Sequence, residues 1–364
     1  MRADLCGAAV FVIWLQPTAS MSALLGVKVS RVNTLLLRQQ QIQRRWLLGL
    51  LLLLIAVFVA NLLVGPIALS RILAGEPLSP MQQQVLLQLR LPRACLAMLL
   101  GAGLAMSGCV LQTLLQNPLA EPGLIGVSSG ASLVAVMMLF LAQRLGVMLP
   151  PWGLSIAAFS GALLVTSTLL FLARGGRLDN VRLLLLGVAI GICSSAITTW
   201  LLYFANDQSL REIMFWMMGS LAYGQSQPLW WWLPYLVVMA WLVVRRDSLT
   251  LLQLGDYQAQ LMGLDLRRIR WQLVLAVCVL SGLAVALAGS IGFIGLLIPH
   301  LMRLLGRGSA RFVLLASMLA GAVALLLADL LSRNLLPSGE LPVGIITASL
   351  GAPLLIFLLV RRHV

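Results

Sequence analysis

Three arginines are the side chains of this 364-residue sequence best suited to chemistry. Arg90 and Arg93 lie in the segment Leu89-Arg-Leu-Pro-Arg93, and Arg333 follows Asp329 at a spacing of four residues. A guanidinium binds carboxylates and phosphates but stays protonated at ordinary pH, so it does not act as a proton donor or base. An aspartate and an arginine at i and i+4 meet on one face of a helix. These residues therefore indicate anion binding.

Sequence features of catalytic sites are lacking elsewhere in the chain. The phosphate-binding pattern GxxxxGK[ST] and the zinc pattern HExxH do not occur, and no apolar run contains a pair of carboxylates. The only histidines, His300 and His363, are far apart in the sequence. We therefore expect no enzyme activity, and no cofactor or metal bound by this chain.

The segment Leu89–Arg93 is expected to open a helix, because proline suits the first helical turn. Arginines at that point lie beside the positive end of the helix dipole, which is unfavourable unless an anion compensates. We interpret Arg90 and Arg93 as residues that bind an external anion. The alternative is that both extend toward lipid headgroups.

A turn rich in helix breakers follows the next apolar run. Asn117-Pro118 and Glu121-Pro122-Gly123 must interrupt a helix. Small residues just before it let neighbouring backbones approach closely, and they lie at positions 101, 103, 105, 107 and 108. We interpret the turn as part of a gate at the cytoplasmic end of a pathway, with Asn117 and Leu119 near it. The alternative is an ordinary turn at the membrane interface.

The longest polar loop, Arg245–Arg270, contains apolar residues that a simple connector does not need. Leu249–Gly255 and Tyr257–Gly263 are short amphipathic pieces separated by glycine. We predict two short helices that dock a soluble partner, in preference to a helix lying on the membrane surface.

Composition places all of these segments in a membrane protein. The chain is 60% hydrophobic and 10% charged, whereas a soluble domain has about a quarter of its residues charged. A membrane helix needs about 20 apolar residues. We predict an all-α membrane protein with ten spans: 46–64, 93–115, 124–142, 151–173, 182–205, 228–244, 271–289, 291–305, 311–330 and 341–360. The eighth is short.

The positions of the basic residues orient these spans. With both termini in the cytoplasm, the cytoplasmic segments hold 18 lysines and arginines and the outer segments hold 6. This bias is the one expected of a membrane protein. It explains the net charge of +14, which in a soluble protein would suggest nucleic acid, so we expect lipid and no nucleic acid as partner.

Two further features concern the organisation of the chain. We expect residues 1–37 to be a poorly ordered extension, or to contain a start site assigned too early, and residues 38–364 to form the membrane domain. A similar pattern occurs twice in the sequence. The first copy starts at Gly103-Leu-Ala-Met and leads through small residues to Asn117-Pro118, and the second starts at Gly282-Leu-Ala-Val and leads to Pro299-His300. This echo suggests an inverted repeat of spans 2–5 on spans 7–10.

Four motifs resemble those of the FecCD-type permeases, the membrane subunits of ABC importers for iron-siderophores, haem and cobalamin. They are LRLPR at 89–93, NPLAEPGLIGVSSGAS at 117–132, GSIGFIGLLIPHLMRLLG at 289–306 and the segment 328–361. The resemblance extends from about Arg38 to Arg362. Within the family, the residues Arg-Gln-Gln-Gln at 38–41, Glu121 and Trp216–Gly219 favour the members that import cobalamin.

The resemblance implies partners and roles for named residues. It implies a homodimer in the inner membrane, two copies of a cytoplasmic ATPase that binds ATP and magnesium, and a periplasmic binding protein. Arg90, Arg93 and Arg333 match the arginines that dock the binding protein. The gate matches Asn117, Leu119, Asn180 and Val181, although this chain has Asp179-Asn180-Val181 where cobalamin importers have small hydroxyl residues. The loop 249–268 matches the region that contacts the ATPase and couples its movement to the permease. The residues assigned to this role are Leu251, Leu254, Gly255, Ala259, Leu261 and Gly263.

The expected function is therefore ATP-driven import of cobalamin, with this chain as the permease. A ferric siderophore or haem is the alternative cargo within the same family. A self-contained channel or secondary transporter is the alternative from another class. It would need ion-coupling carboxylates inside the membrane, and Asp329, near the end of a span, is the only candidate.

Overall fold

The computed structural model describes residues 19–64, 79–150, 152–172, 180–222, 229–306, 309–336 and 339–361. All of them lie in helices or in the turns between helices, and no strand occurs among them. The chain divides into two units, Met1–Leu48 and Gly49–Val364. All packing reported below lies within the second unit.

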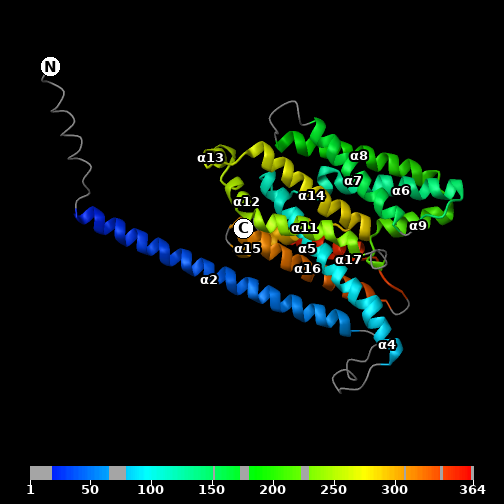
Figure 1. Ribbon diagram of the computed structural model, residues 1–364, viewed down its shortest axis with the longest axis horizontal. Coiled ribbons are helices and arrows are strands. Elements are labelled where there is room, and N and C mark those ends of the chain that lie inside the picture. Colours follow the sequence, from blue (N-terminus) through cyan, green and yellow to red (C-terminus); the bar gives the residue numbers. More distant parts are fainter. Residues whose placement is uncertain are drawn as a thin grey trace. The chain divides into compact units, whose positions relative to one another are not determined.

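The helices of the described residues follow one another along the chain in Figure 1. They are α2 (Ala19–Leu63), α4 (Pro80–Gln84), the π-helix η1 (Val85–Arg90), α5 (Leu91–Leu114), the 3-10 helix η2 (Pro122–Ile125), α6 (Val127–Leu145), α7 (Gly153–Leu172), α8 (Asn180–Tyr203), α9 (Asp207–Met217), the 3-10 helix η4 (Leu229–Trp231), α11 (Trp232–Val244), α12 (Arg246–Leu252), α13 (Asp256–Leu261), α14 (Leu266–Ala288), α15 (Ile294–Gly306), α16 (Ala310–Asn334) and α17 (Val343–Arg361).

Seven of the described helices are long and apolar enough to cross a membrane. They lie in Leu37–Leu63, Pro80–Leu114, Val127–Leu145, Gly153–Leu172, Leu184–Tyr203, Leu266–Ala288 and Ala310–Asn334. Three further apolar helices are shorter, within α11, α15 and α17. Each of the ten predicted runs overlaps one of these helices, and the helix in the eighth run is short as predicted. That all ten cross the membrane stays a prediction.

The first unit and the start of the second are joined by one continuous helix, α2. The predicted extension, residues 1–37, is helical from Ala19 to residue 37, and residues 1–18 lie outside the described part of the chain. The division at residue 37 stays a prediction.

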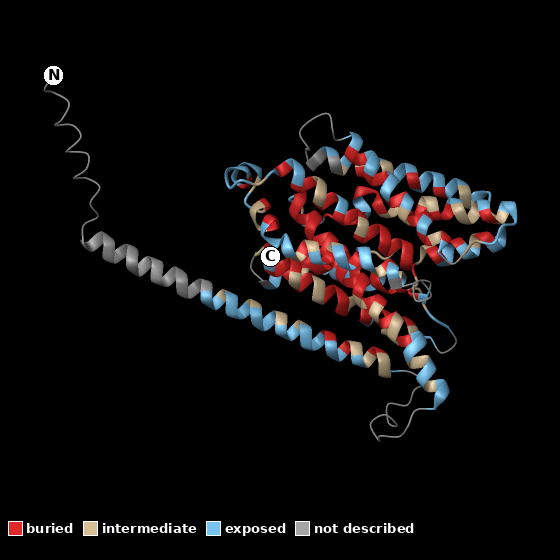
Figure 2. Cartoon of the chain, viewed as in Figure 1, coloured by how far each residue is buried: buried red, intermediate tan, exposed pale blue. Residues whose placement is uncertain are grey.

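The core of the second unit is built around α5 and α14. Helix α5 packs against α14, α15 and α16, and α14 packs in turn against α7 and α6. Figure 2 shows the buried residues gathered on these central helices, while α8 is largely exposed. In a membrane protein an exposed apolar face is the one available to lipid or to another subunit.

Small residues allow the central helices to pack closely. A Cβ atom on Gly101 would collide with the carbonyl oxygen of Gly321, and one on Gly108 would collide with that of Gly295. The close approach predicted for the small residues of α5 is therefore confirmed at these positions.

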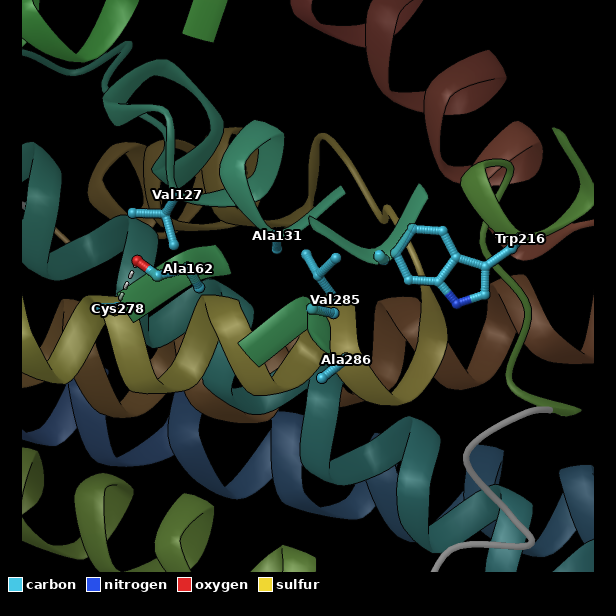
Figure 3. Packing of buried hydrophobic residues seen from close by; sticks show 9 residues of the cluster. Val127, Ala131, Ala162, Trp216, Cys278, Val285 and Ala286 are labelled. Atoms are coloured by element: carbon cyan, nitrogen blue, oxygen red, sulfur yellow. Dashed lines mark hydrogen bonds between the residues drawn. The ribbon is translucent and has the colours of Figure 1, made fainter. Parts of the chain in front are cut away.

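A second apolar cluster joins α6, α7, α9 and α14 (Figure 3). Ala131, Ala162 and Val285 are almost completely buried in it together with the indole of Trp216. The thiol of Cys278 donates to the carbonyl of Ala162 at 3.5 Å. This cluster ties the surface helix α9 to the bundle.

The segment predicted to open the second span begins α5, with Pro92 in the first turn as expected, but two helical segments that were not predicted precede α5 without a break. The helix starts at Pro80, where Ser79 and Gln82 form a capping box. The ring of Pro92 excludes the ordinary hydrogen bond to the carbonyl four residues earlier. The chain adapts by a π-helix at Val85–Arg90, in which the N–H of Leu91 donates to the carbonyl of Leu86.

Candidate docking, gate and coupling sites

The three predicted arginines come together with Asn61, Asp329 and Glu340 in one group, which we call the arginine cluster. Arg93 comes from α5, Arg90 from the end of η1, and Arg333 from the last turn of α16. Asn61 belongs to the last turn of α2, and Glu340 to the loop before α17. Three stretches far apart in the sequence, at 61, 90–93 and 329–340, therefore build the cluster.

Asp329 is the centre of this cluster and is completely buried. Its Oδ1 accepts from Nε of Arg93 at 2.8 Å, and its Oδ2 lies 3.1 Å from Nη2 of Arg333. Asn61 donates to Oδ2 at 3.3 Å and accepts from Arg333 at 2.6 Å. A buried carboxylate is stable only when paired and hydrogen-bonded in this way. The predicted Asp329–Arg333 pair is confirmed.

Glu340 is the acid of the cluster that reaches the surface. Its Oε2 lies 2.8 Å from Nη1 of Arg93, and its side chain is 52% exposed, against 7% for Arg93. Arg90 instead donates to the carbonyl of Leu62 at 2.8 Å. The arginine cluster contains three guanidinium groups and two carboxylates, so its net charge is +1. The cluster is suited to receive an external carboxylate, with Glu340 as the acid most easily replaced.

The sequence did not reveal the internal partners of Arg90 and Arg93. Arg90 and Arg93 were expected to need an external anion because they lay at a helix start. In the structure Asp329, 236 residues from Arg93, already neutralises it. The docking role of the three arginines stays a prediction.

The predicted gate lies in a short irregular segment between α5 and α6, which we call the gate turn (residues 115–126). The side chain of Asn117 accepts from the N–H of Leu119 at 2.9 Å, and Leu119 is 38% exposed. Gly187 of α8 packs closely against Ile125. Asn180 is the first residue of α8, and the side chains of Asn180 and Val181 lie outside the described part. The structure therefore places the gate turn against α8 but tests no gating role.

Glu121 connects the gate turn to the loop that precedes α15. Its Oε1 accepts from the N–H of Phe293 at 3.0 Å, and Phe293 has a φ of 68°. Burial raises the pKa of the Glu121 carboxyl above its ordinary value, and the hydrogen bond from Phe293 lowers the pKa in part. Residue types alone gave no indication of this contact.

The two predicted short helices of the loop 245–270 are present as α12 and α13, which we call the coupling helices. Gly255 and Gly263 separate them from each other and from α14, with φ values of 97° and 84° that favour glycine. Leu254 and Leu261 are 51% and 70% exposed, whereas Leu251 is half-buried and Ala259 is completely buried. Ala259 therefore packs against the body, and Leu254 and Leu261 provide the exposed apolar surface.

Polar contacts join the coupling helices to the membrane helices. Both oxygens of Asp256 lie 2.7 Å from Nη2 of Arg270 in α14. Asp247 pairs with Arg311 of α16 at 2.6 Å. Gln116 of the gate turn donates to the carbonyl of Leu252 at 2.9 Å. None of these contacts follows from local spacing in the sequence, because the paired residues are 14 or more positions apart.

Comparison with known proteins gives one consistent family. Residues 47–361 match the FecCD transport family. The vitamin B12 import system permease protein BtuC of Klebsiella pneumoniae subsp. pneumoniae is 46% identical over 325 residues, which are 89% of this chain and 96% of the relative. The protein of the same name from Vibrio cholerae is 45% identical over 336 residues, 89% of this chain and 97% of the relative.

A solved structure agrees with these relatives. It is described as an inward-facing conformation of a metal-chelate type ABC transporter, and it is 33% identical with a TM-score of 0.78. The match covers 87% of this chain and 99% of that one. The chain belongs to the FecCD transport family.

Proposed function

We propose that this chain is the permease subunit of an ATP-driven importer that carries cobalamin from the periplasm across the inner membrane. The observation that carries the proposal is the similarity to vitamin B12 import permeases along 96–97% of their length. The exposed leucines of the coupling helices support an ATPase partner, and the arginine cluster supports a partner that presents carboxylates.

The proposed assembly is a homodimer with two copies of a cytoplasmic ABC ATPase and one periplasmic binding protein. Binding and hydrolysis of ATP occur on the ATPase, and the permease alternates between outward- and inward-open states. The gate formed by Asn117, Leu119, Asn180 and Val181 closes the cytoplasmic end. Leu251, Leu254, Gly255, Ala259, Leu261 and Gly263 form the region that responds to the ATPase.

The proposed topology has ten spans, with both termini in the cytoplasm and an inverted repeat of spans 2–5 on 7–10. The three shorter apolar helices are then partial spans, or spans around which the bilayer is locally thinned. Single cysteines at Met148 and Tyr257, which are 96% and 74% exposed, test it in intact cells. An impermeant thiol reagent added outside should label position 148 and not position 257. Labelling at both positions or only at 257 contradicts the topology.

The cargo is tested in a strain from which the gene for this chain has been deleted. Uptake of labelled cobalamin should be lost and restored by the gene, while uptake of ferric siderophore and haem should be unchanged. The resemblance to a metal-chelate transporter supports ferric chelates as the second candidate. Loss of ferric chelate uptake with normal cobalamin uptake would favour that candidate.

A further inference from the structure

The gate turn begins with a residue in an unfavourable backbone conformation. Gln116 has a φ of 51°, in the left-handed region where residues other than glycine are uncommon. Such a conformation persists only where surrounding contacts hold it. The contacts of Gln116 therefore indicate what the conformation provides.

The amide of Gln116 joins the ends of two helices that are distant in sequence. Its Nε2 donates to the carbonyl of Thr113 at 3.1 Å and to the carbonyl of Leu252 at 2.9 Å. Thr113 lies in the last turn of α5 and Leu252 is the last residue of α12. Carbonyls in the last turn of a helix lack intrahelical partners. The amide of Gln116 is a partner for the carbonyl of Thr113, and it is a second partner for the carbonyl of Leu252, which also accepts from the N–H of Gly255 at 3.2 Å.

The residues after Gln116 form a tightly bonded turn. The N–H of Asn117 donates to the carbonyl of Gln112 at 3.2 Å, and the N–H of Ala120 donates to the carbonyl of Asn117 at 3.2 Å. The side chain of Asn117 holds the N–H of Leu119. A displacement applied at Gln116 therefore moves Asn117 and Leu119 with it.

The opposite end of this turn is anchored independently of α12. Glu121 holds the N–H of Phe293 immediately before α15, and Gly187 of α8 packs against Ile125. The turn is thus fixed to the bundle at residues 121–125 and, through Gln112 of α5, at residue 117, and it is fixed to a coupling helix at residue 116.

We infer that Gln116 is the positioning residue that transmits movement of α12 to the gate turn. This inference rests on the proposed function, because it assumes that the coupling helices respond to an ATPase and that Asn117 and Leu119 lie at a gate. The nearby pair Asp256–Arg270 joins α13 to α14 and not to the gate turn. The contact from Gln116 to Leu252 therefore assigns to α12 a direct connection with the gate.

The test compares transport with ATP hydrolysis in the complete complex of permease, ATPase and binding protein in proteoliposomes. Gln116→Gly removes the amide and accepts the left-handed conformation, so it preserves the backbone. Gln116→Leu keeps the bulk without the donor. We expect assembly and ATPase activity within about twofold of the wild type, and a fall of about tenfold in cobalamin transported per ATP. The matched control is Gln84→Leu on α4, whose amide donates only within one exposed turn, to Gln88.

The possible outcomes separate coupling from simple helix capping. Unchanged transport per ATP in both Gln116 variants overturns the inference. So does a loss of assembly and thermal stability in both variants, because that result assigns Gln116 a structural role only.

A distance measurement makes the inference independent of the cargo. Spin labels at Thr250 of α12 and at Pro118, an exposed residue between Asn117 and Leu119, in a background without native cysteines, report whether the two segments move together when nucleotide binds. With Gln116 present, we expect the same distance between the labels with and without nucleotide. In Gln116→Gly, we expect the distance to change when nucleotide binds. Equal behaviour of both proteins contradicts the inference. A complex that hydrolyses ATP without moving cobalamin contradicts the proposed cargo and leaves this distance test valid.

Discussion

Asp329 neutralises two arginines from different helices and has no exposed surface. Asp329→Ala leaves Arg93 with Glu340 alone and leaves Arg333 without its carboxylate partner. Removing one partner of a buried ion pair destabilises a protein by about 3 kcal/mol or more. We expect a clear fall in the unfolding midpoint in detergent.

A matched control for this variant is Asp247→Ala. Asp247 also faces two arginines, Arg246 and Arg311, but its side chain is 61% exposed. Exposed pairs contribute about 1 kcal/mol or less. Equal destabilisation by the two variants would contradict the central place of Asp329 in the arginine cluster.

Arg90 is the arginine whose removal disturbs the cluster least, because it donates to a carbonyl and not to Asp329. In Arg90→Ala we expect the affinity for the binding protein to fall about tenfold, which is about 1.4 kcal/mol. The loss should be greatest at low salt, since charge steers association. Surface-bound permease titrated with the binding protein measures it. Arg211→Ala on α9, which removes an exposed arginine where Arg90 is a buried one, should bind normally, and normal binding by Arg90→Ala would exclude a docking role.

Glu121 gives a pH dependence whose sign follows from its burial. Its pKa is raised in the folded protein from an ordinary value of 4.5, so the folded state binds the proton more tightly than the unfolded state. Stability should therefore decrease as the pH rises from about 4.5 toward the raised pKa. Glu121→Gln should remove this part of the decrease. Unfolding midpoints of both proteins across that range provide the measurement, and identical slopes would show that Glu121 does not titrate there.

At the scale of elements, the contact between α5 and α16 depends on paired glycines. A methyl group on Gly101 would meet the backbone of Gly321, which cannot move aside as a flexible side chain would. We expect Gly101→Ala to cost about 1–3 kcal/mol or more, as overpacking does. Gly49→Ala on α2 is the control, because nothing lies within 4 Å of its added Cβ. A Gly101→Ala protein as stable as the control would show that these helices do not pack at this point.

The ten apolar helices were predictable from the sequence because each appears in it as a long apolar run. The two coupling helices were also predictable, because glycines bound them and apolar residues recur between charged ones. Two elements were not. Helix α9 is short and amphipathic, although Asn206, which accepts from the N–H of Ser209 at 2.8 Å, marks its start. Pro92 lies in the first turn of α5, the position that proline suits, but nothing in the sequence indicated the α4 and π-helix turns that precede it.

The candidate sites were predictable only in part. Residue types and the family resemblance identified the arginines and the gate turn. The contacts of Asn61, Gln116, Glu121 and Glu340 depend on which helices are neighbours, and a single sequence does not contain that information. Local spacing revealed the Asp329–Arg333 pair because those residues lie on one helix.

At the scale of the whole molecule, the three sites lie on one set of connected helices. The arginine cluster joins α2, α5 and α16, and the coupling helices contact α5, α14 and α16. Helix α5 therefore has Arg93 near its start and the gate turn at its end. This arrangement suits a subunit that links an external partner to a cytoplasmic one. A self-contained carrier would not need the exposed leucines that follow α12 and end α13.

The most direct test is cobalamin uptake by proteoliposomes that contain this chain with its ATPase and binding protein. We predict uptake that requires ATP inside, requires the binding protein outside, and stops when the ATPase is omitted. Uptake by this chain alone without nucleotide, or no cobalamin uptake by a complex that hydrolyses ATP and binds the binding protein, would contradict the account.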